Sequence, residues 1–289
     1  MLREALQAAI TRLTAERVPS PRLNAETLLM FTLNCDRAHL YAHPERELTQ
    51  EEQSRYEEAL TQRAKGVPAQ YITGHQEFWG LDLIVSPAVL IPRPETEHLI
   101  EAVLPLAKPM KAPKIADVGT GSGAIALALA KELPQAEIHA TDNSPAALEI
   151  AEANAARLQL EFRKSNQHES ERRLFFHDTD LLNGLEAGTF DFVVSNPPYV
   201  GLSEEDEVQL EVRKFEPRAA VFAGSTGLEV IEKLIPAARA AMKPGGYLVM
   251  EISGTIAERV RELLDGWEDV GIRDDLQKIP RVACARKPI

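Results

Sequence analysis

Residues 196–199, Asn-Pro-Pro-Tyr, are the stretch whose residue types are best suited to chemistry. The Asn196 side chain carries one carbonyl acceptor and two N–H donors. The carbonyls of the Asn-Pro and Pro-Pro bonds have no neighbouring N–H to compete with them, and proline keeps the backbone stiff. The loop therefore suits a substrate –NH2 group, whose two hydrogens would meet the Asn196 side-chain oxygen and the Pro197 carbonyl. Tyr199 would add a flat wall for a planar amide or base. The alternative is a plain stop at the end of a strand.

A glycine-rich turn, Gly119-Thr120-Gly121-Ser122-Gly123, is the second candidate. Glycine is needed where a backbone turns with positive φ or comes close to a ligand. Asp142 follows the next predicted strand, where an acid can accept both hydroxyls of a ribose. The two features predict an adenosine-containing cofactor. NAD and S-adenosylmethionine both stay open, because the spacing to Ala124 also fits the dinucleotide fingerprint. Asp180, after the third strand, either reaches the adenine amino group or caps a helix.

Alternating strand and helix patterns surround both motifs. Seven strands are predicted, and no helical stretch separates the last two, so we expect these to pair antiparallel. This pattern predicts an α/β fold with a doubly wound sheet, in which the first and fourth strands are neighbours at the switch point. The glycine turn and Asn196 would then open on one crevice. Residues 163–173 are polar and predict a long exposed turn.

The chain divides by pattern into three parts. Residues 1–67 predict a small helical bundle domain, in which Thr49 and Glu52 form a capping box. This domain is either a lid or partner-docking module, or a structural appendage. Residues 68–95 predict a linker with a β-hairpin, and residues 96–289 the α/β domain. Arg93, Glu95 and Glu97 near this boundary either begin a helix in solvent or line a site.

Composition limits the classes of function. The net charge of −12 over 289 residues argues against tight non-specific binding of nucleic acid and favours a basic protein partner. Two distant cysteines, Cys35 and Cys284, give neither a disulfide framework nor a zinc site, which is compatible with a reducing cytoplasm. The first residues are amphipathic, and no apolar run is long enough to span a membrane. We interpret His39 and His43 as ordinary histidines without a metal.

The two motifs together favour methyl transfer to nitrogen, a reaction that needs no metal. A dehydrogenase would require an acid near the hydride path, and the fourth strand offers only Tyr199. A nucleobase amino-N-methyltransferase shares the 196–199 chemistry, but the acidic charge and the lack of a basic recognition region argue against it. A non-enzymatic nucleotide-binding protein would have no use for these four residues.

The segment Asp117–Ala124 resembles the first motif of class I S-adenosylmethionine-dependent methyltransferases, and residues 196–199 resemble the fourth motif of those that methylate amino or amide nitrogen. Three further stretches resemble the peptide chain release factor glutamine methyltransferases: Pro68–Gly74, Val89–Glu97 and Phe215–Arg218. The resemblance covers nearly the whole chain. It implies a seven-stranded class I methyltransferase (Rossmann-like) sheet with an N-terminal helical domain.

The resemblance also implies a reaction and its residues. The family transfers a methyl group from S-adenosylmethionine, leaving S-adenosylhomocysteine, to the Gln side-chain amide of the release factors' Gly-Gly-Gln loop, in the cytoplasm. Residues 119–123 would hold the methionine end of the cofactor and Asp142 its ribose. Asn196 would contact cofactor and substrate, and Pro197, Pro198 and Tyr199 the Gln amide. Leu181 stands where some relatives have a Trp over the adenine, and Lys278 where a Gly is expected. We expect a monomer that contacts no membrane and no nucleic acid.

Overall fold

The computed structural model describes residues 1–164 and 173–289, and its contacts divide the chain into two compact units. Unit 1 comprises residues 1–75 and 209–215, and unit 2 comprises residues 76–208 and 216–289. The predicted three-part division at residues 67 and 95 stays a prediction. Segment 209–215 belongs to the helical unit although it comes late in the sequence, because the buried Arg63 side chain pairs with Glu211.

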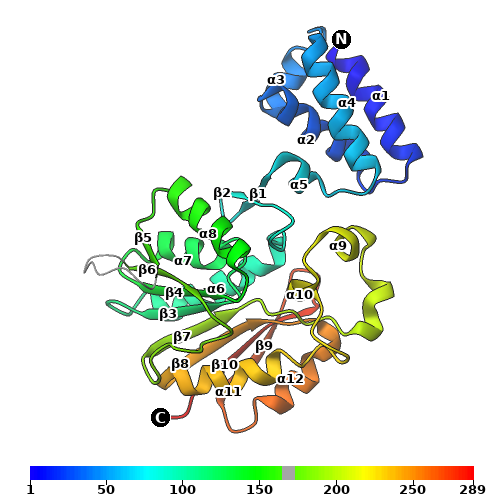
Figure 1. The fold of residues 1–289 in the computed structure, drawn as a ribbon. Helices are drawn as coiled ribbons and strands as arrows, with labels where there is room; N and C mark the ends of the chain where they lie inside the picture. Colours follow the sequence, from blue (N-terminus) through cyan, green and yellow to red (C-terminus); the bar gives the residue numbers. More distant parts are fainter. Residues whose placement is uncertain (165–172) are drawn as a thin grey trace. The chain divides into compact units, whose positions relative to one another are not determined.

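Unit 1 is helical (Figure 1). Its helices are α1 (Leu2–Ala15), α2 (Pro21–Leu33), α3 (Arg37–Ala42), α4 (Gln50–Ala64), α5 (Ala69–Thr73) and α9 (Leu210–Phe215). The predicted capping box opens α4, since the Thr49 hydroxyl accepts from Glu52 N at 3.2 Å and Glu52 accepts from Thr49 N at 2.9 Å. Apolar side chains from α1, α2 and α4, among them Leu13, Leu28 and Leu60, form its core. Helix α5 was not predicted.

Unit 2 is built on one mixed sheet of eight strands, in the order β5-β6-β4-β3-β7-β8-β10-β9. The strands are β3 (Lys114–Val118), β4 (Glu137–Asp142), β5 (Phe162–Lys164), β6 (Leu174–Asp178), β7 (Phe190–Ser195), β8 (Met242–Glu251), β9 (Glu268–Asp274) and β10 (Pro280–Arg286). A hairpin of β1 (His75–Phe78) and β2 (Leu81–Ile84) forms a separate small sheet, as predicted.

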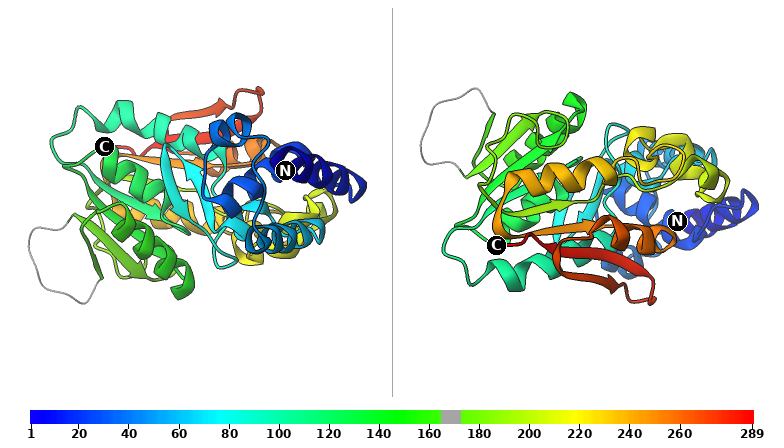
Figure 2. Two further views of the ribbon diagram at one scale, coloured as in Figure 1. Left: turned by 90° about the horizontal axis from the view of Figure 1, so that it is seen from above. Right: turned by 90° about the horizontal axis from the view of Figure 1, so that it is seen from below.

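Helices cover both faces of the sheet (Figure 1), and Figure 2 shows these layers from above and from below. One face carries α6 (Glu97–Ala107), α7 (Ala124–Glu132) and α8 (Pro145–Arg157), and the other carries α11 (Ile231–Ala241) and α12 (Ala257–Leu263). Short elements complete the unit: α10 (Arg218–Val221), η1 (Pro94–Thr96), η2 (Leu202–Glu207) and η3 (Gly254–Ile256). The predicted doubly wound α/β fold is confirmed, and a methyltransferase of class I has this architecture.

The sheet differs from the prediction at one edge. All seven predicted strands are present and the last two pair antiparallel, but β5 adds an eighth strand beside β6. Sequence patterns missed β5 because three residues are too short for a periodic signal. The long turn predicted over residues 163–173 is wrong at Arg163 and Lys164, which belong to β5, and its residues 165–172 lie outside the described residues. Strand β8 also begins earlier than predicted, at Met242, and its first part is irregular: the register with β7 shifts between Phe190 and Phe192, and Gly245 in this part has a φ of +78°.

Strand register brings the two motifs together at one end of the sheet. Strands β3 and β7 are parallel neighbours with Val118 opposite Ser195, so Gly119 and Asn196 follow side by side. The Ser195 hydroxyl donates to the Val118 carbonyl at 2.7 Å and joins the two strand ends. Strand β8 flanks β7 with Met250 opposite Ser195, which brings Glu251 beside Asn196. None of the helices formed by the described residues has the length and apolar character needed to cross a membrane.

Candidate active site

A cavity of about 290 Å³ lies at the carboxyl ends of β3, β4, β6 and β7 in unit 2. This volume is near the lower end of small-molecule sites, about 300–1,000 Å³. The sequence singled out twelve residues as cofactor- or substrate-binding. Ten of them line this cavity: Gly119, Thr120, Gly121, Ser122, Asp142, Asp180, Leu181, Asn196, Pro197 and Pro198. Gly123 and Tyr199 are absent from its lining. The prediction that the glycine turn and Asn196 open on one crevice is thus met.

The glycine turn presents open backbone to this cavity. Gly119 and Gly121 have φ values of +73° and +56°, a region that favours glycine. A Cβ at either position would meet nothing within 4 Å, so a ligand can approach the backbone from that side. Gly123 has a different role: a Cβ there would lie 3.0 Å from Leu127 Cδ1 and 3.2 Å from Ala151 Cβ. It permits close packing of α7 on α8 and does not line the cavity.

Asp142 ends β4 and is held by two backbone N–H groups. Its Oδ2 accepts from Gly121 N and its Oδ1 from Ser144 N, each at 2.9 Å. Burial raises the pKa of Asp142 above its ordinary value, against the lowering effect of these hydrogen bonds. Each carboxylate oxygen keeps a lone pair for a further donor. Asp142 can therefore accept two hydroxyl hydrogens from a ligand in the cavity.

Asp117 lies beneath the glycine turn and is fully buried. Its Oδ2 accepts from Thr120 Oγ1 at 2.7 Å and from Ala126 N at 3.1 Å. Its Oδ1 has no hydrogen-bond partner among the described residues. Burial raises the pKa of Asp117 to about 7, although the hydrogen bonds from Thr120 and Ala126 lower it. A buried acid of this kind gains most from a nearby positive charge.

A contact that the sequence did not predict orients the side-chain amide of Asn196. Its Nδ2 donates to Thr96 Oγ1 at 3.1 Å, and Thr96 Oγ1 in turn donates to Glu251 Oε2 at 2.6 Å. Tyr199 lies off the cavity lining, and its hydroxyl donates to Glu251 Oε1 at 3.0 Å. Burial, with Glu251 next to it, raises the pKa of Tyr199. The Asn196 side-chain oxygen is thus left for a ligand, as the motif requires.

The residues directly after β6 border the end of the cavity where the adenine of the cofactor is predicted to lie. Asp180 and Leu181 line the cavity beside Thr179. Leu181 adopts a φ of +52°, an uncommon and strained backbone conformation for leucine. This conformation sets the direction in which its side chain leaves the backbone. Its side chain is partly buried against the cluster on the α11 face. Lys278, where the resemblance expects a Gly, has a φ of +63°.

Of the three charged residues near the predicted boundary at residue 95, Arg93 and Glu97 have structural partners, and Glu95 is absent from the cavity lining. Arg93 pairs with Glu216, whose other oxygen accepts from Ile91 N at 3.1 Å. Glu97 accepts from Trp79 N at 2.8 Å and connects the start of α6 to the residue that follows β1 of the hairpin. Two of the stretches that carry the family resemblance, 89–97 and 215–218, therefore meet in an ion pair between the half-buried Arg93 and the buried Glu216. Neither Arg93 nor Glu97 lines the cavity.

Asn154 is a further residue that sequence reasoning missed. It is fully buried on α8, and its Nδ2 donates to the Ser122 carbonyl at 2.9 Å and to the Ile84 carbonyl at 3.0 Å. Its Oδ1 accepts from Ile84 N at 2.6 Å. An asparagine on the apolar face of a predicted helix was the available signal, since a buried amide needs partners.

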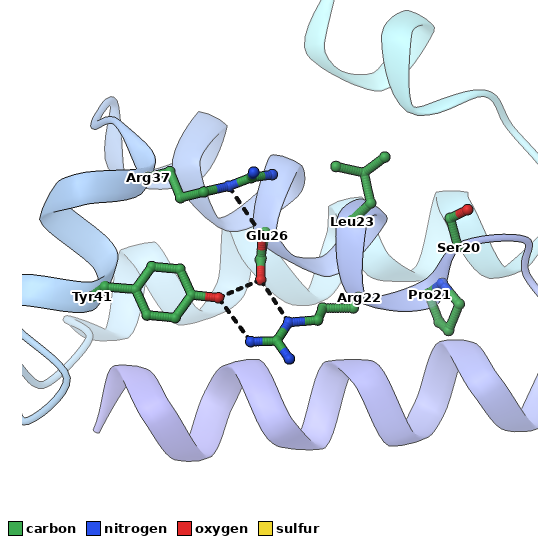
Figure 3. A pocket seen from close by; sticks show the side chains of 7 residues that line it. All are labelled: Ser20, Pro21, Arg22, Leu23, Glu26, Arg37 and Tyr41. Carbon is green, nitrogen blue, oxygen red and sulfur yellow. Dashed lines mark hydrogen bonds and ion pairs between the residues drawn. The ribbon is translucent and has the colours of Figure 1, made fainter.

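A second cavity, of about 520 Å³, lies in unit 1 between α2 and α3 (Figure 3). Its polar groups are already paired: Glu26 accepts from Tyr41 at 2.5 Å and from Arg22 at 3.0 Å, and lies 3.2 Å from Arg37. Because these charges and hydrogen bonds satisfy one another, the cavity offers little to a ligand. The titratable residues that the structure describes include no cluster suited to a metal ion.

Two protein-family models and several sequence relatives match this chain. A model of the PrmC N-terminal domain matches residues 4–74, and a model of the methyltransferase small domain matches residues 96–214. A protein of Koribacter versatilis, named release factor glutamine methyltransferase, is 54% identical over 290 residues, covering 99% of each chain. A protein of the same name from Moorella thermoacetica is 43% identical, over 91% of this chain and 89% of its own.

A solved structure of a ribosomal protein L11 methylase from Lactobacillus delbrueckii subsp. bulgaricus has 22% identity and a TM-score of 0.49, over 70% of this chain and 84% of its own. The sequence relatives agree with the resemblance drawn from the motifs and do not favour the nucleobase alternative. The identity over nearly the full length shows that the chain belongs to the release factor glutamine methyltransferase family.

Proposed function

We propose that this enzyme transfers the methyl group of S-adenosylmethionine to the side-chain amide nitrogen of the Gln in the Gly-Gly-Gln loop of peptide chain release factors, and so modulates translation termination. One observation carries the proposal: the open glycine turn after β3 and Asn196 after β7 line a single cavity. The relatives that share the name span almost all of the chain.

The residues of the cavity fit S-adenosylmethionine. Gly119 and Gly121 leave room where a Cβ would stand, and Asp142 has acceptor capacity for the two ribose hydroxyls. The unpartnered Oδ1 of Asp117 lies beneath the turn, where a cationic methionine end would lower the free energy of a buried carboxylate. Asp180 and Leu181 would border the adenine. When bound, the cofactor supplies an electrophilic methyl group on a sulfonium.

The task of the protein is to make a poor nucleophile react. An amide nitrogen has its lone pair delocalised into the carbonyl. Asn196 Oδ1 and the Pro197 carbonyl would accept its two hydrogens, so that the lone pair can develop toward the methyl carbon. Orientation of this kind can lower the barrier by several kcal/mol, about 7–11 at most, and acceptors already in place stabilise the charge that builds on nitrogen. As the N–C bond forms and the S–C bond breaks, the nitrogen loses one proton to solvent.

The proposal also includes the cellular compartment, the oligomeric state and the partners of the enzyme. A release factor is a protein of the cytoplasm, and the charge of −12 suits a basic protein surface better than nucleic acid. We place the enzyme there as a monomer without direct nucleic-acid or membrane contact.

Transfer of label from S-adenosylmethionine to a purified release factor tests the proposal. A release factor whose Gly-Gly-Gln loop carries Gln→Ala is the matched control, because only the acceptor side chain differs. Label on the unchanged factor alone would support reaction, substrate and position together. Label on neither factor, with cofactor binding shown by calorimetry, would reject the proposed acceptor.

A further inference from the structure

We propose that Thr96 and Glu251 are positioning residues for methyl transfer, which hold the Asn196 amide so that its oxygen and not its –NH2 group faces the substrate. The inference rests on the proposed function and deepens it. It assigns a role to two residues, one before α6 and one at the end of β8, that have no part in the cofactor motifs.

The geometry is a chain of hydrogen bonds whose two middle members, Thr96 and Glu251, are buried. Asn196 Nδ2 donates to Thr96 Oγ1 at 3.1 Å, Thr96 donates to Glu251 Oε2 at 2.6 Å, and Tyr199 donates to Glu251 Oε1 at 3.0 Å. Residues Thr96 and Glu251 are 4% and 1% exposed. Water therefore competes little for these groups, and each hydrogen bond has a fixed partner.

Counting protons sets the direction of the chain. An ionised carboxylate is an acceptor only, and a hydroxyl has one hydrogen to donate. The one hydrogen of Thr96 is committed to Glu251, so Thr96 Oγ1 can only accept from its other neighbour. That neighbour must then be the donor end of the Asn196 amide. With Glu251 ionised, the Thr96 hydroxyl sets the orientation of this amide.

The orientation matters because the two ends of the amide have opposite functions. With the oxygen outward, Asn196 accepts a hydrogen from the substrate –NH2 group. With the amide turned over, two donors would face each other and the nitrogen lone pair would lose its direction. Asn side chains turn about a soft terminal torsion, so a neighbour has to select one orientation.

The segment that carries Thr96 is itself held in place. Thr96 is the last residue of η1, directly before α6. Upstream, Arg93 pairs with the buried Glu216, and Ile91 N donates to the same carboxylate at 3.1 Å. Downstream, Glu97 accepts from Trp79 N at 2.8 Å. Contacts on both sides of Thr96 thus fix the hydroxyl that Asn196 meets.

The direct test uses Thr96→Val, Thr96→Ser and the matched control Thr32→Val, a buried threonine of unit 1 whose hydroxyl donates to the Leu28 carbonyl. Valine keeps the shape of threonine without the hydroxyl, and serine keeps the hydroxyl. We expect Thr96→Val to lower kcat on the order of 10- to 100-fold, as a misplaced reacting group does, with an unchanged Kd for S-adenosylmethionine. Thr96→Ser should restore kcat, and Thr32→Val should leave it unchanged. Thermal unfolding of each variant separates misfolding from lost positioning.

A double-mutant comparison decides whether Thr96 acts through Asn196. In an Asn196→Ala background, Thr96→Val should cause no further loss of kcat, because no amide is left to orient. A loss that multiplies with that of Asn196→Ala, a wild-type kcat in Thr96→Val, or a Thr96→Ser variant as impaired as Thr96→Val would overturn the inference. Failure of the wild-type enzyme to label the release factor would reject the proposed function instead, which is a separate result.

Discussion

Asn154 donates a hydrogen bond to the backbone carbonyl of Ser122 at 2.9 Å, and so joins helix α8 to the glycine turn. Two more hydrogen bonds tie the same side chain to Ile84 of the hairpin. We predict that Asn154→Ala lowers the free energy of unfolding by about 2–4 kcal/mol and weakens cofactor binding. Urea unfolding and calorimetry measure the two effects. The exposed Asn183→Ala is the control, and wild-type cofactor affinity in Asn154→Ala would limit Asn154 to stability.

Asp142 is expected to determine cofactor affinity. Asp142→Ala removes a charged acceptor and also frees Gly121 N and Ser144 N. Because a hydrogen bond to a charged group contributes about 1.5–3 kcal/mol, the Kd for S-adenosylmethionine should rise about 10- to 100-fold. Calorimetry tests this directly. Asp265→Ala removes an exposed carboxylate elsewhere and should leave the Kd unchanged. An unaltered Kd in Asp142→Ala would show that a residue other than Asp142 binds the ribose.

Asn196 is expected to act on the substrate more than on the cofactor. Its side-chain oxygen is the acceptor that the Thr96 contact leaves for a ligand. We predict that Asn196→Ala loses most of the turnover, while the Kd for S-adenosylmethionine stays close to the wild-type value. Steady-state kinetics with the release factor, together with calorimetry, give both numbers. Equal losses of turnover and of cofactor affinity would contradict a role chiefly on the substrate.

Asp117 makes the stability of the cofactor-free protein depend on pH. Its pKa rises from an ordinary 3.8 to about 7 because the carboxylate is buried. Between these values the folded state holds a proton that the unfolded state has lost, so stability falls as pH rises. The loss is complete above pH 7 and can reach about 4 kcal/mol.

Asp117→Asn has no such proton to hold. We predict that the free energy of unfolding drops less from pH 5 to pH 8 in this variant than in the wild type. Urea unfolding at both pH values measures the two slopes, and comparing slopes removes the constant cost of the substitution. Parallel slopes would show that Asp117 is ionised in the folded protein throughout this range.

We expect kcat to fall at acidic pH because Glu251 becomes protonated; this fall is the acidic limb of the pH profile. Burial raises its pKa above 4.5; Glu95 adds to the rise, while hydrogen bonds from Thr96 and Tyr199 and the charge of Arg281 oppose it. Protonated Glu251 can donate to Thr96, which then donates to the Asn196 oxygen and turns the amide over. We therefore expect kcat to fall as pH drops through this pKa. Thr96→Val removes the hydroxyl that links Glu251 to Asn196, so the kcat of this variant should not fall over the same acidic pH range. An identical limb in both proteins would assign it to another group.

Local signals were enough to predict most of the residues that line the cavity. Glycines at 119 and 121, an acid at the end of a strand and Asn-Pro-Pro each depend on a few adjacent residues. Their meeting in one cavity followed from a general rule of doubly wound sheets. Seven strands were predicted for the same reason, since each has its own apolar pattern.

The residues that orient the site could not be predicted in this way. Thr96 and Glu251 meet across 155 positions of sequence, and Asn154 meets Ile84 across 70. Such contacts depend on how elements pack and leave no periodic signal. Tyr199 shows the same limit: the sequence predicted a flat wall for a planar amide or base, whereas in the structure Tyr199 lies off the cavity lining and its hydroxyl donates to Glu251. Strand β5 was missed because its three residues carry no pattern of their own.

The most direct measurement of the central claim is mass spectrometry of the release-factor peptide that contains the Gly-Gly-Gln loop, after reaction with the wild-type enzyme and with Asn196→Ala. The account predicts one added methyl group, located by fragmentation on the Gln side chain, with the wild type, and an almost unmodified peptide with the variant. A methyl group on another residue, or equal methylation by both proteins, would contradict it.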